Sequence, residues 1–112
     1  MSKRLEQLFL AEINPYKECN FVLAISGGVD SMVLANLFLI NNLNFSIAHC
    51  NFQLRGKESD DDELFINKWC SEKDIKLYNK KFSTEDYCKN NKLTIQMGAR
   101  ELRYEWFREL ID

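Results

Sequence analysis

Apolar and polar positions along the chain form blocks that predict an alternation of strands and helices. Short, continuous apolar runs are typical of buried parallel strands, whereas apolar positions three and four residues apart are typical of helices with one buried face. On this basis the sequence predicts strands at residues 20–26, 44–50 and 76–82. The third run is more polar than the others, which favours a place at an edge of the sheet.

Two helices are predicted in the first part of the chain. Ser2 can cap the first helix, and Asn14-Pro15 ends it, because the residue before a proline avoids the helical region. The apolar face of this helix is formed by Leu5, Leu8, Phe9 and Ile13. The second helix follows the first strand and runs to about Ile40.

Three more helices are predicted after the second strand. Ser59 caps one of them, and Asp62 completes a capping box. Its apolar side is supplied by Leu64, Phe65, Trp69 and Cys70. Ser83 with Asp86 caps a short helix that runs through Lys89, and Thr94 caps the last one. The buried face of the last helix is formed by Ile95, Ala99, Leu102, Trp106 and Leu110, and we interpret it as core, not as a platform for stacking bases.

This order predicts an α/β fold with three α/β/α layers. Alternating strands and helices favour a parallel sheet with right-handed crossovers and a Rossmann-like, doubly wound topology. The chain supplies the first three strands of such a sheet. Ligands of these folds bind at the carboxyl ends of the strands, where residues after the first and second strands would meet.

Composition narrows the class of protein. The chain has 112 residues, 46% of them hydrophobic, which suits one domain at most and argues against disorder. A net charge of −2 does not indicate a protein that binds nucleic acid strongly. The four cysteines form no C-x-x-C pair, which argues against a zinc or iron–sulfur site and predicts reduced, mostly buried thiols. The first residues contain no long apolar run, so we expect no signal peptide, no membrane partner and a cytoplasmic location.

The most informative motif is Ser26-Gly27-Gly28-Val29-Asp30-Ser31, which lies between the first strand and the second helix. Two glycines let the backbone approach an anion closely, and the N–H groups at the helix start then point at it. The motif lacks the Gly-Lys-Ser/Thr of the common P-loop and the G-x-G-x-x-G of dinucleotide-binding folds. The alternative interpretation is an ordinary Gly-Gly turn that caps a helix.

The motif resembles the S-G-G-x-D-S loop of the PP-loop ATP pyrophosphatase superfamily. Three further stretches narrow the resemblance: residues 49–56 (HCNFQLRG), 58–63 (ESDDDE) and 98–104 (GARELRY). Together with the loop, in this order, they are similar to the N-terminal catalytic domain of the tRNA(Ile)-lysidine synthetase family. The resemblance covers nearly the whole chain, from about Phe21 to Leu110.

The resemblance implies a ligase that forms a carbon–nitrogen bond during tRNA modification. Such an enzyme uses ATP and Mg²⁺ to adenylate carbon 2 of the wobble cytidine of isoleucine tRNA, and free lysine then displaces AMP. The residues that would bind ATP are Ser26, Gly27, Gly28, Val29, Asp30, Ser31, His49 and Asn51. Asp30 would also hold Mg²⁺, and Arg100, followed by Arg103, would contact phosphate or the activated intermediate.

The chain departs from the family pattern at two positions and in length. Phe52 replaces the second histidine of the first stretch, and Gln96 replaces an acidic residue before the last one. Roles that the family assigns to those two positions are therefore not carried over. Because family members are longer, residues 1–112 are expected to form a truncated N-terminal part of the ATP-binding domain.

Several of these residues also have purely structural interpretations. For His49, a core or loop residue and a nucleotide contact are equally weighted interpretations. For Arg55 we favour a brace of its loop over contact with RNA or phosphate. The acidic run at residues 60–63 is interpreted as a solvated helix start and not as a metal site. Arg100 and Arg103 could form ion pairs with three carboxylates: Glu101, Glu105 or Asp62.

Two other function classes stay open at this point. One is another PP-loop adenylating enzyme, such as a tRNA thiolase or an amidotransferase-type synthetase, although a cytidine thiolase would show paired cysteines. The other is a folded nucleotide-binding fragment without turnover, which we predict for the isolated chain. The apolar edge at residues 21–26 predicts a homodimer through strand pairing.

Overall fold

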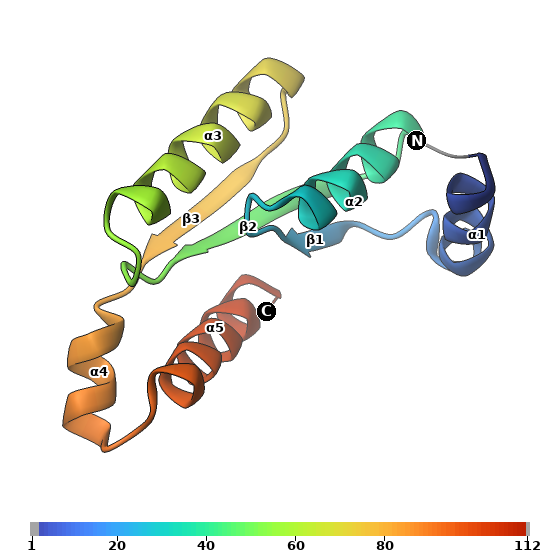
Figure 1. Ribbon diagram of the computed structural model, residues 1–112. Helices are drawn as coiled ribbons and strands as arrows, with labels where there is room; N and C mark the ends of the chain where they lie inside the picture. The colour runs from blue at the N-terminus through green and yellow to red at the C-terminus, as the bar shows by residue number, and fades with distance from the viewer. Residues whose placement is uncertain (1–2, 112) are drawn as a thin grey trace.

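The computed structural model describes residues 3–111 and has the predicted alternation of helices and strands (Figure 1). The elements are, in chain order, α1 (Lys3–Ile13), the 3₁₀ turn η1 (Asn14–Tyr16), β1 (Phe21–Ala24), α2 (Val29–Ile40), β2 (Phe45–Asn51), α3 (Lys57–Lys73), β3 (Leu77–Lys81), α4 (Thr84–Asn91) and α5 (Ile95–Ile111). The cap predicted at Ser2 lies outside the described residues. None of the helices within residues 3–111 combines the length and the apolar character needed to cross a membrane.

The three strands form a parallel sheet in the order β1-β2-β3. Leu23 pairs with Ile47, and Ile47 pairs with Leu77, so apolar residues align across the sheet. Helices α2 and α3 cover one face, and α5 lies on the other (Figure 1). The predicted three-layer α/β/α class is therefore confirmed, and β3 is an edge strand, as its polar sequence predicts.

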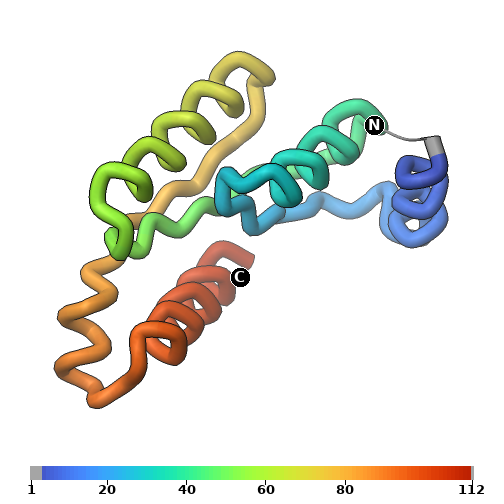
Figure 2. Tube along the Cα trace, viewed as in Figure 1, coloured from blue at the N-terminus to red at the C-terminus, as the bar shows by residue number. Residues whose placement is uncertain are grey.

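The chain is elongated, with extents of 46 × 27 × 24 Å. The trace in Figure 2 shows α1 at one end and α4 at the other, with the sheet between them. In the described part of the chain β1 pairs only with β2, so its outer edge is open. The homodimer through this edge stays a prediction, and a single monomeric species by light scattering well above micromolar concentration would contradict it.

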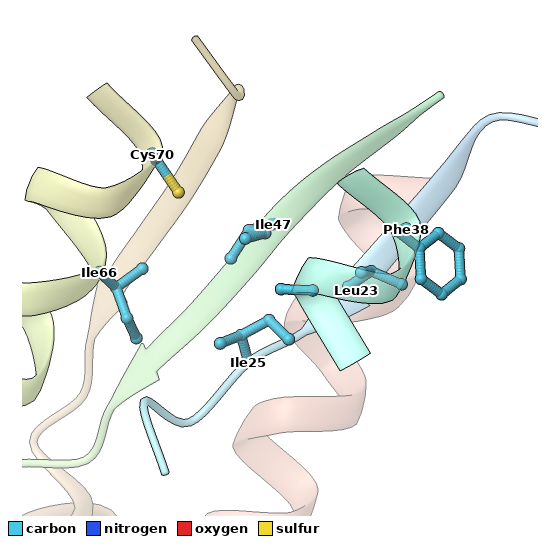
Figure 3. Packing of buried hydrophobic residues seen from close by; sticks show 7 residues of the cluster. Leu23, Ile25, Phe38, Ile47, Ile66 and Cys70 are labelled. Atoms are coloured by element: carbon cyan, nitrogen blue, oxygen red, sulfur yellow. The ribbon is translucent and has the colours of Figure 1, made fainter. Parts of the chain in front are cut away.

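The larger core fills the space between the sheet, α2 and α3 (Figure 3). Its buried residues come from the sheet and from both covering helices: Leu23, Ile25, Ala35, Phe38, Ile47, Ile66 and Cys70. Odd-numbered residues of β1 and β2 point into this core because side chains alternate along a strand. At one end, Phe38 packs edge-on against the rings of Phe9 and Phe21, with centroids 5.1 and 5.0 Å away.

The opposite face of the sheet carries a smaller, aromatic core. Ala48, Phe82 and Trp106 are buried there, and Trp106 meets Phe82 edge-on at 6.1 Å. Trp106 is thus a core residue, as predicted. Covering of this face is incomplete at β1, where Val22 remains 40% exposed.

The start of α3 differs from the prediction. The helix begins at Lys57, after Gly56 with a φ of +56°, so Ser59 lies within its first turn and is no N-cap. The Ser59 hydroxyl instead accepts a hydrogen bond from the Arg55 N–H at 3.2 Å. The predicted capping box with Asp62 is therefore wrong. Ser83 precedes α4 but its side chain forms no cap hydrogen bond, whereas Thr94 Oγ1 accepts one from the Met97 N–H, as predicted.

Some predicted buried residues are exposed. Leu64 and Phe65 are 64% and 51% exposed, because Ile66 and Cys70, four residues apart, are the side chains of α3 that face the sheet. Leu5 and Leu8 of α1 and Ile95 of α5 are exposed as well. Helix α1 packs on the larger core through Phe9 and Ile13, the other two residues of its predicted face. The cysteine prediction is half right: Cys70 and Cys88 are buried, Cys50 is intermediate and Cys19 is exposed.

Candidate functional site

The turn between β1 and α2 is held by hydrogen bonds within the Ser-Gly-Gly-x-x-Ser motif. The Gly27 N–H donates to Ser31 Oγ at 3.2 Å, and the Gly28 N–H donates to Ser26 Oγ at 3.3 Å. The Ser31 hydroxyl donates to the Gly28 carbonyl at 2.9 Å, and the two serine oxygens are 3.3 Å apart. Both serines therefore shape the loop from inside.

The first turn of α2 presents unpaired backbone donors. Gly28 is the N-cap and no side chain caps the helix, while the Met32 N–H is bonded to the Gly28 carbonyl at 3.0 Å. The N–H groups of Val29, Asp30 and Ser31 consequently have no intrahelical acceptor. Three such donors at the positive end of a helix form an anion-binding arrangement.

Gly27 is required by its backbone conformation, and it lies in contact with α3. Its φ is +95°, which L side chains rarely adopt. A Cβ atom at this position would lie 3.4 Å from both Asp62 Cβ and Ile66 Cδ1. The loop thus rests directly on α3, and the side chain of Asp62 lies beside it.

A pocket of about 240 Å³ opens next to the loop, at the carboxyl ends of β1 and β2. It is lined by Ser26, His49, Cys50, Asn51, Phe52, Leu54, Arg55, Ser59 and Asp62. The structure therefore brings together the segments that follow the first two strands, as expected for a parallel sheet.

His49, which lines this pocket, has a buried ring nitrogen without a hydrogen-bond partner. The side chain is only 3% exposed, and its Nδ1 lies 2.8 Å from the Ile25 carbonyl oxygen. Because a carbonyl only accepts, Nδ1 carries the proton, and neutral His49 has its acceptor lone pair on Nε2. Nε2 is buried and has no hydrogen-bond partner. Buried polar atoms are nearly always paired, so this one points to a ligand.

Asn51 lines the same pocket but is engaged within the protein. Its amide donates to Asp60 Oδ1 at 3.0 Å, and its side-chain oxygen accepts from the Gln53 N–H at 2.9 Å. The residue is 1% exposed. In this state Asn51 shapes the loop after β2, and nucleotide contact by Asn51 stays a prediction.

Arg55 and Asp62 close one side of the pocket. Arg55 Nη2 lies 2.6 Å from Asp62 Oδ2, and Nη1 lies 3.3 Å from Glu58 Oε1. This is the bracing arrangement that the sequence favoured for Arg55. Asp62 itself was missed as a lining residue, although Ser59, Asp62 and Ile66 have the spacing of one helix face.

Arg100 and Arg103 lie on the other side of the sheet, on α5. Both guanidinium groups pack over the Tyr104 ring, 5.4 and 5.3 Å from its centroid. Arg103 lines a second hollow of about 120 Å³ together with Ser26 and other residues of β1, β2 and α5. Arg100 lines an open hollow one helical turn away, beside Gln96. Thus Arg103, and not Arg100, lies next to the loop.

The ion pairs considered for these arginines are not formed. Within residues 3–111, neither Arg100 nor Arg103 has a carboxylate within 4.0 Å. Held on an aromatic ring without a paired anion, each guanidinium retains its donors for another acceptor.

Cys50 lines both hollows, together with Ser26 and Phe52. Burial raises the pKa of its thiol from the ordinary value of 9.0 to about 11, against the opposing effect of the Arg103 charge. Cys50 is therefore a neutral thiol near pH 7 and no nucleophile.

The two family departures have different surroundings. Phe52 stacks on Phe82 at 5.4 Å, so it extends the aromatic core where the family has a histidine. Gln96 lies in the open hollow with Arg100. As for metals, the described residues include no group of three or more His, Cys, Asp or Glu side chains that could hold an ion. Asp30 is a single exposed carboxylate in the first turn of α2.

Comparison with known proteins agrees with this geometry. A family model described as a PP-loop domain matches residues 1–112. The tRNA(Ile)-lysidine synthase of Porphyromonas gingivalis is 44% identical over 91 residues, which cover 80% of this chain and 20% of that protein. The synthase of Chlorobaculum tepidum is 42% identical over 93 residues, covering 80% and 28%, and that of Clostridium tetani is 33% identical over 111 residues, covering 92% and 24%. The chain therefore spans between a fifth and three tenths of the length of these relatives.

Proposed function

The chain belongs to the PP-loop domain family, and from this premise we propose that residues 26–31 bind the phosphates of ATP. The observation that carries the proposal is the uncapped start of α2, where three backbone N–H groups without an intrahelical acceptor lie at the positive end of the helix dipole. The serine hydroxyls and Gly27 keep the turn in the shape that exposes these donors.

The nucleoside part of ATP is assigned to the pocket beside the loop. Its volume of about 240 Å³ suits a base or a ribose, and Phe52 and Leu54 give it apolar walls. His49 Nε2 is an acceptor without a donor, which a ligand hydroxyl or amino group would supply. Hydrogen bonding to the ligand would thereby remove the cost of a buried unpaired nitrogen.

The residues present fit a magnesium ion that arrives with the nucleotide. Mg²⁺ in nucleotide sites is typically held by one or two carboxylates, phosphate oxygens and water, so a dedicated cluster of ligands is not needed. Asp30 is the carboxylate on the loop and is exposed to solvent. The ion would supply positive charge to the phosphates as pyrophosphate leaves.

Arg103 and Arg100 are assigned to the negatively charged groups of the reaction. A guanidinium keeps its charge and donates two parallel hydrogen bonds to phosphate. Arg103 shares a hollow with Ser26 of the loop, so it is the nearer donor. Arg100 would contact the more distant parts of the activated intermediate.

The names of the relatives suggest the reaction in which this site takes part. We assign the chain to the ATP-binding part of a lysidine synthetase, a ligase that joins free lysine to carbon 2 of the wobble cytidine of isoleucine tRNA. In this reaction ATP adenylates the cytidine with release of pyrophosphate, and the lysine ε-amino group then displaces AMP. The chain by itself is expected to show no turnover.

The test is a measurement of ATP binding and pyrophosphate release. ATP affinity of the chain is measured by calorimetry, with Gly27→Val as the variant that removes the loop conformation. Pyrophosphate release is measured with ATP, lysine and isoleucine tRNA, and the full-length Porphyromonas gingivalis relative serves as positive control. Equal ATP affinity of the wild type and Gly27→Val would contradict the proposed site, and turnover by the chain alone would contradict the expected inactivity.

A further inference from the structure

A negative charge lies beside the proposed phosphate loop. The Asp62 Cβ and Cγ atoms are 3.4 and 3.6 Å from the position of a Cβ on Gly27. A free carboxylate beside the loop would repel a phosphate held by the N–H groups of the loop, because like charges a few ångströms apart disfavour each other. The loop therefore needs a cation on Asp62 if it is to bind an anion well.

Arg55 provides that cation. Its Nη2 atom lies 2.6 Å from Asp62 Oδ2, and it is the only cationic side chain within 4.0 Å of Asp62 in the described part of the chain. Asp62 is the more enclosed partner, with 31% of its side chain exposed against 56% for Arg55. The carboxylate is thus the less accessible member of the pair.

The backbone that carries Arg55 is itself fixed. The Arg55 N–H donates to Ser59 Oγ at 3.2 Å, and its carbonyl accepts from the Glu58 N–H at 3.2 Å. Gln53, two residues earlier, donates its side-chain amide to the Phe82 carbonyl at 2.9 Å. These bonds tie the segment to α3 and to the end of β3, so the guanidinium is held over Asp62 before any ligand arrives.

We propose that Arg55 is a positioning residue that neutralises Asp62, so that residues 26–31 accept a phosphate, and that Arg55 itself does not contact the nucleotide. This inference rests on the proposed ATP site. The two side chains then act together: removal of the Arg55 cation weakens phosphate binding only if the Asp62 carboxylate is still present.

A double-mutant cycle tests whether the two side chains act together. Affinities for ATP and for pyrophosphate are measured by calorimetry for the wild type, Arg55→Ala, Asp62→Asn and the double variant. Arg55→Ala is expected to weaken both ligands roughly tenfold, because one unpaired charge then faces the phosphates. Asp62→Asn is expected to bind as tightly as the wild type or more tightly, and the double variant to return to within about twofold of the wild type.

Two further variants control the interpretation. Glu58→Gln removes the second partner of Arg55 but leaves the Asp62 pair intact, so its ATP affinity should equal that of the wild type. Arg55→Lys retains the charge and should recover most of the binding lost in Arg55→Ala. Circular dichroism of each variant reports whether the chain is folded. Loss of an exposed ion pair should not unfold it.

The outcomes separate this inference from the proposed function. A double variant that stays as weak as Arg55→Ala would show that Arg55 contacts the phosphate directly, and an unchanged Arg55→Ala would show that Asp62 has no influence. Either result overturns the inference while the ATP site stands. A wild type that binds neither ATP nor pyrophosphate overturns the proposed function, and the inference with it.

Discussion

The two sides of the sheet meet at the loop, and they are built differently. On the α2 and α3 side the core is larger and combines aliphatic residues with the ring of Phe38, and Ile47 and Ile66 are fully buried. On the α5 side the core is smaller and aromatic, and Val22 of β1 is 40% exposed. The first side supports the loop by direct packing, whereas the second offers it a charged side chain held on an exposed ring.

The two sides of the sheet therefore have different roles: the α3 side supports the loop, and the α5 side offers a side chain for contact with the ligand. The loop touches α3 through Gly27, so its shape depends on how α3 packs on the sheet. Arg103 shares a hollow with Ser26 but forms no ion pair within residues 3–111, and so it keeps its donors free for a ligand. We therefore expect substitutions on the α3 side to act through stability and loop shape, and substitutions on the α5 surface to act through binding.

The largest effect is expected for Ile66→Ala on the α3 side. Ile66 is 0% exposed and also lies against the loop at Gly27. Its truncation therefore leaves a cavity in the core that borders the loop. The free energy of unfolding should fall by about 2–5 kcal/mol. Urea denaturation measures the loss, and backbone amide signals of residues 26–31 should broaden or shift in the folded fraction.

Leu102→Ala is the matched truncation on the α5 side. Leu102 is only partly buried against the aromatic core, so its loss should cost clearly less than that of Ile66. The loop signals should stay in place. If Leu102→Ala destabilised the chain more than Ile66→Ala, the division into a supporting side and a contacting side would be wrong.

The next effect is expected where α4 meets α5. Gly98 is buried, and a Cβ on it would overlap the sulfur of Cys88, with no room for both. Gly98→Ala should therefore destabilise the chain by about 1–3 kcal/mol through overpacking, visible as a lower thermal midpoint. The double variant Gly98→Ala, Cys88→Ala removes the sulfur and should recover most of the loss, and failure to recover would contradict a steric cause.

Arg103 and Arg100 lie on the same helix and pack over the same ring, that of Tyr104, so the variants Arg103→Ala and Arg100→Ala form a matched pair. Because Arg103 lines the hollow with Ser26 and Arg100 does not, Arg103→Ala should weaken ATP roughly tenfold, as loss of a charge-assisted hydrogen bond does. Arg100→Ala should change ATP affinity by less than about threefold. Calorimetric titration measures both, and the reverse order would return Arg100 to the primary role that the family resemblance gave it.

The sequence predicted the helices and strands that carry the site better than the side chains that line it. Periodicity and cap residues place the strands and helices, since these depend on neighbours a few positions away. Asp62 was missed because its place beside Gly27 depends on where α3 starts. The N-cap of that helix is Gly56, with its positive φ, three residues before the expected cap Ser59. Likewise, the exposure of Leu64 and Phe65 depends on the rotation of α3 against the sheet, which local pattern does not determine.

The smallest effect is expected from Cys50, which packs against the aromatic core on the α5 side. Its pKa is raised by burial to about 11, whereas the unfolded chain loses this proton near the ordinary value of 9.0. The stabilisation is therefore fully present below pH 9 and is lost as the pH rises from 9 to 11, because the unfolded state ionises first. Urea denaturation at several pH values should show a shallower decline in this window for Cys50→Ala than for the wild type. Because the Arg103 charge lowers this pKa, Arg103→Ala should extend the decline of the free energy of unfolding to higher pH, and equal slopes in all three proteins would mean that the Cys50 thiol is not buried against the α5-side core.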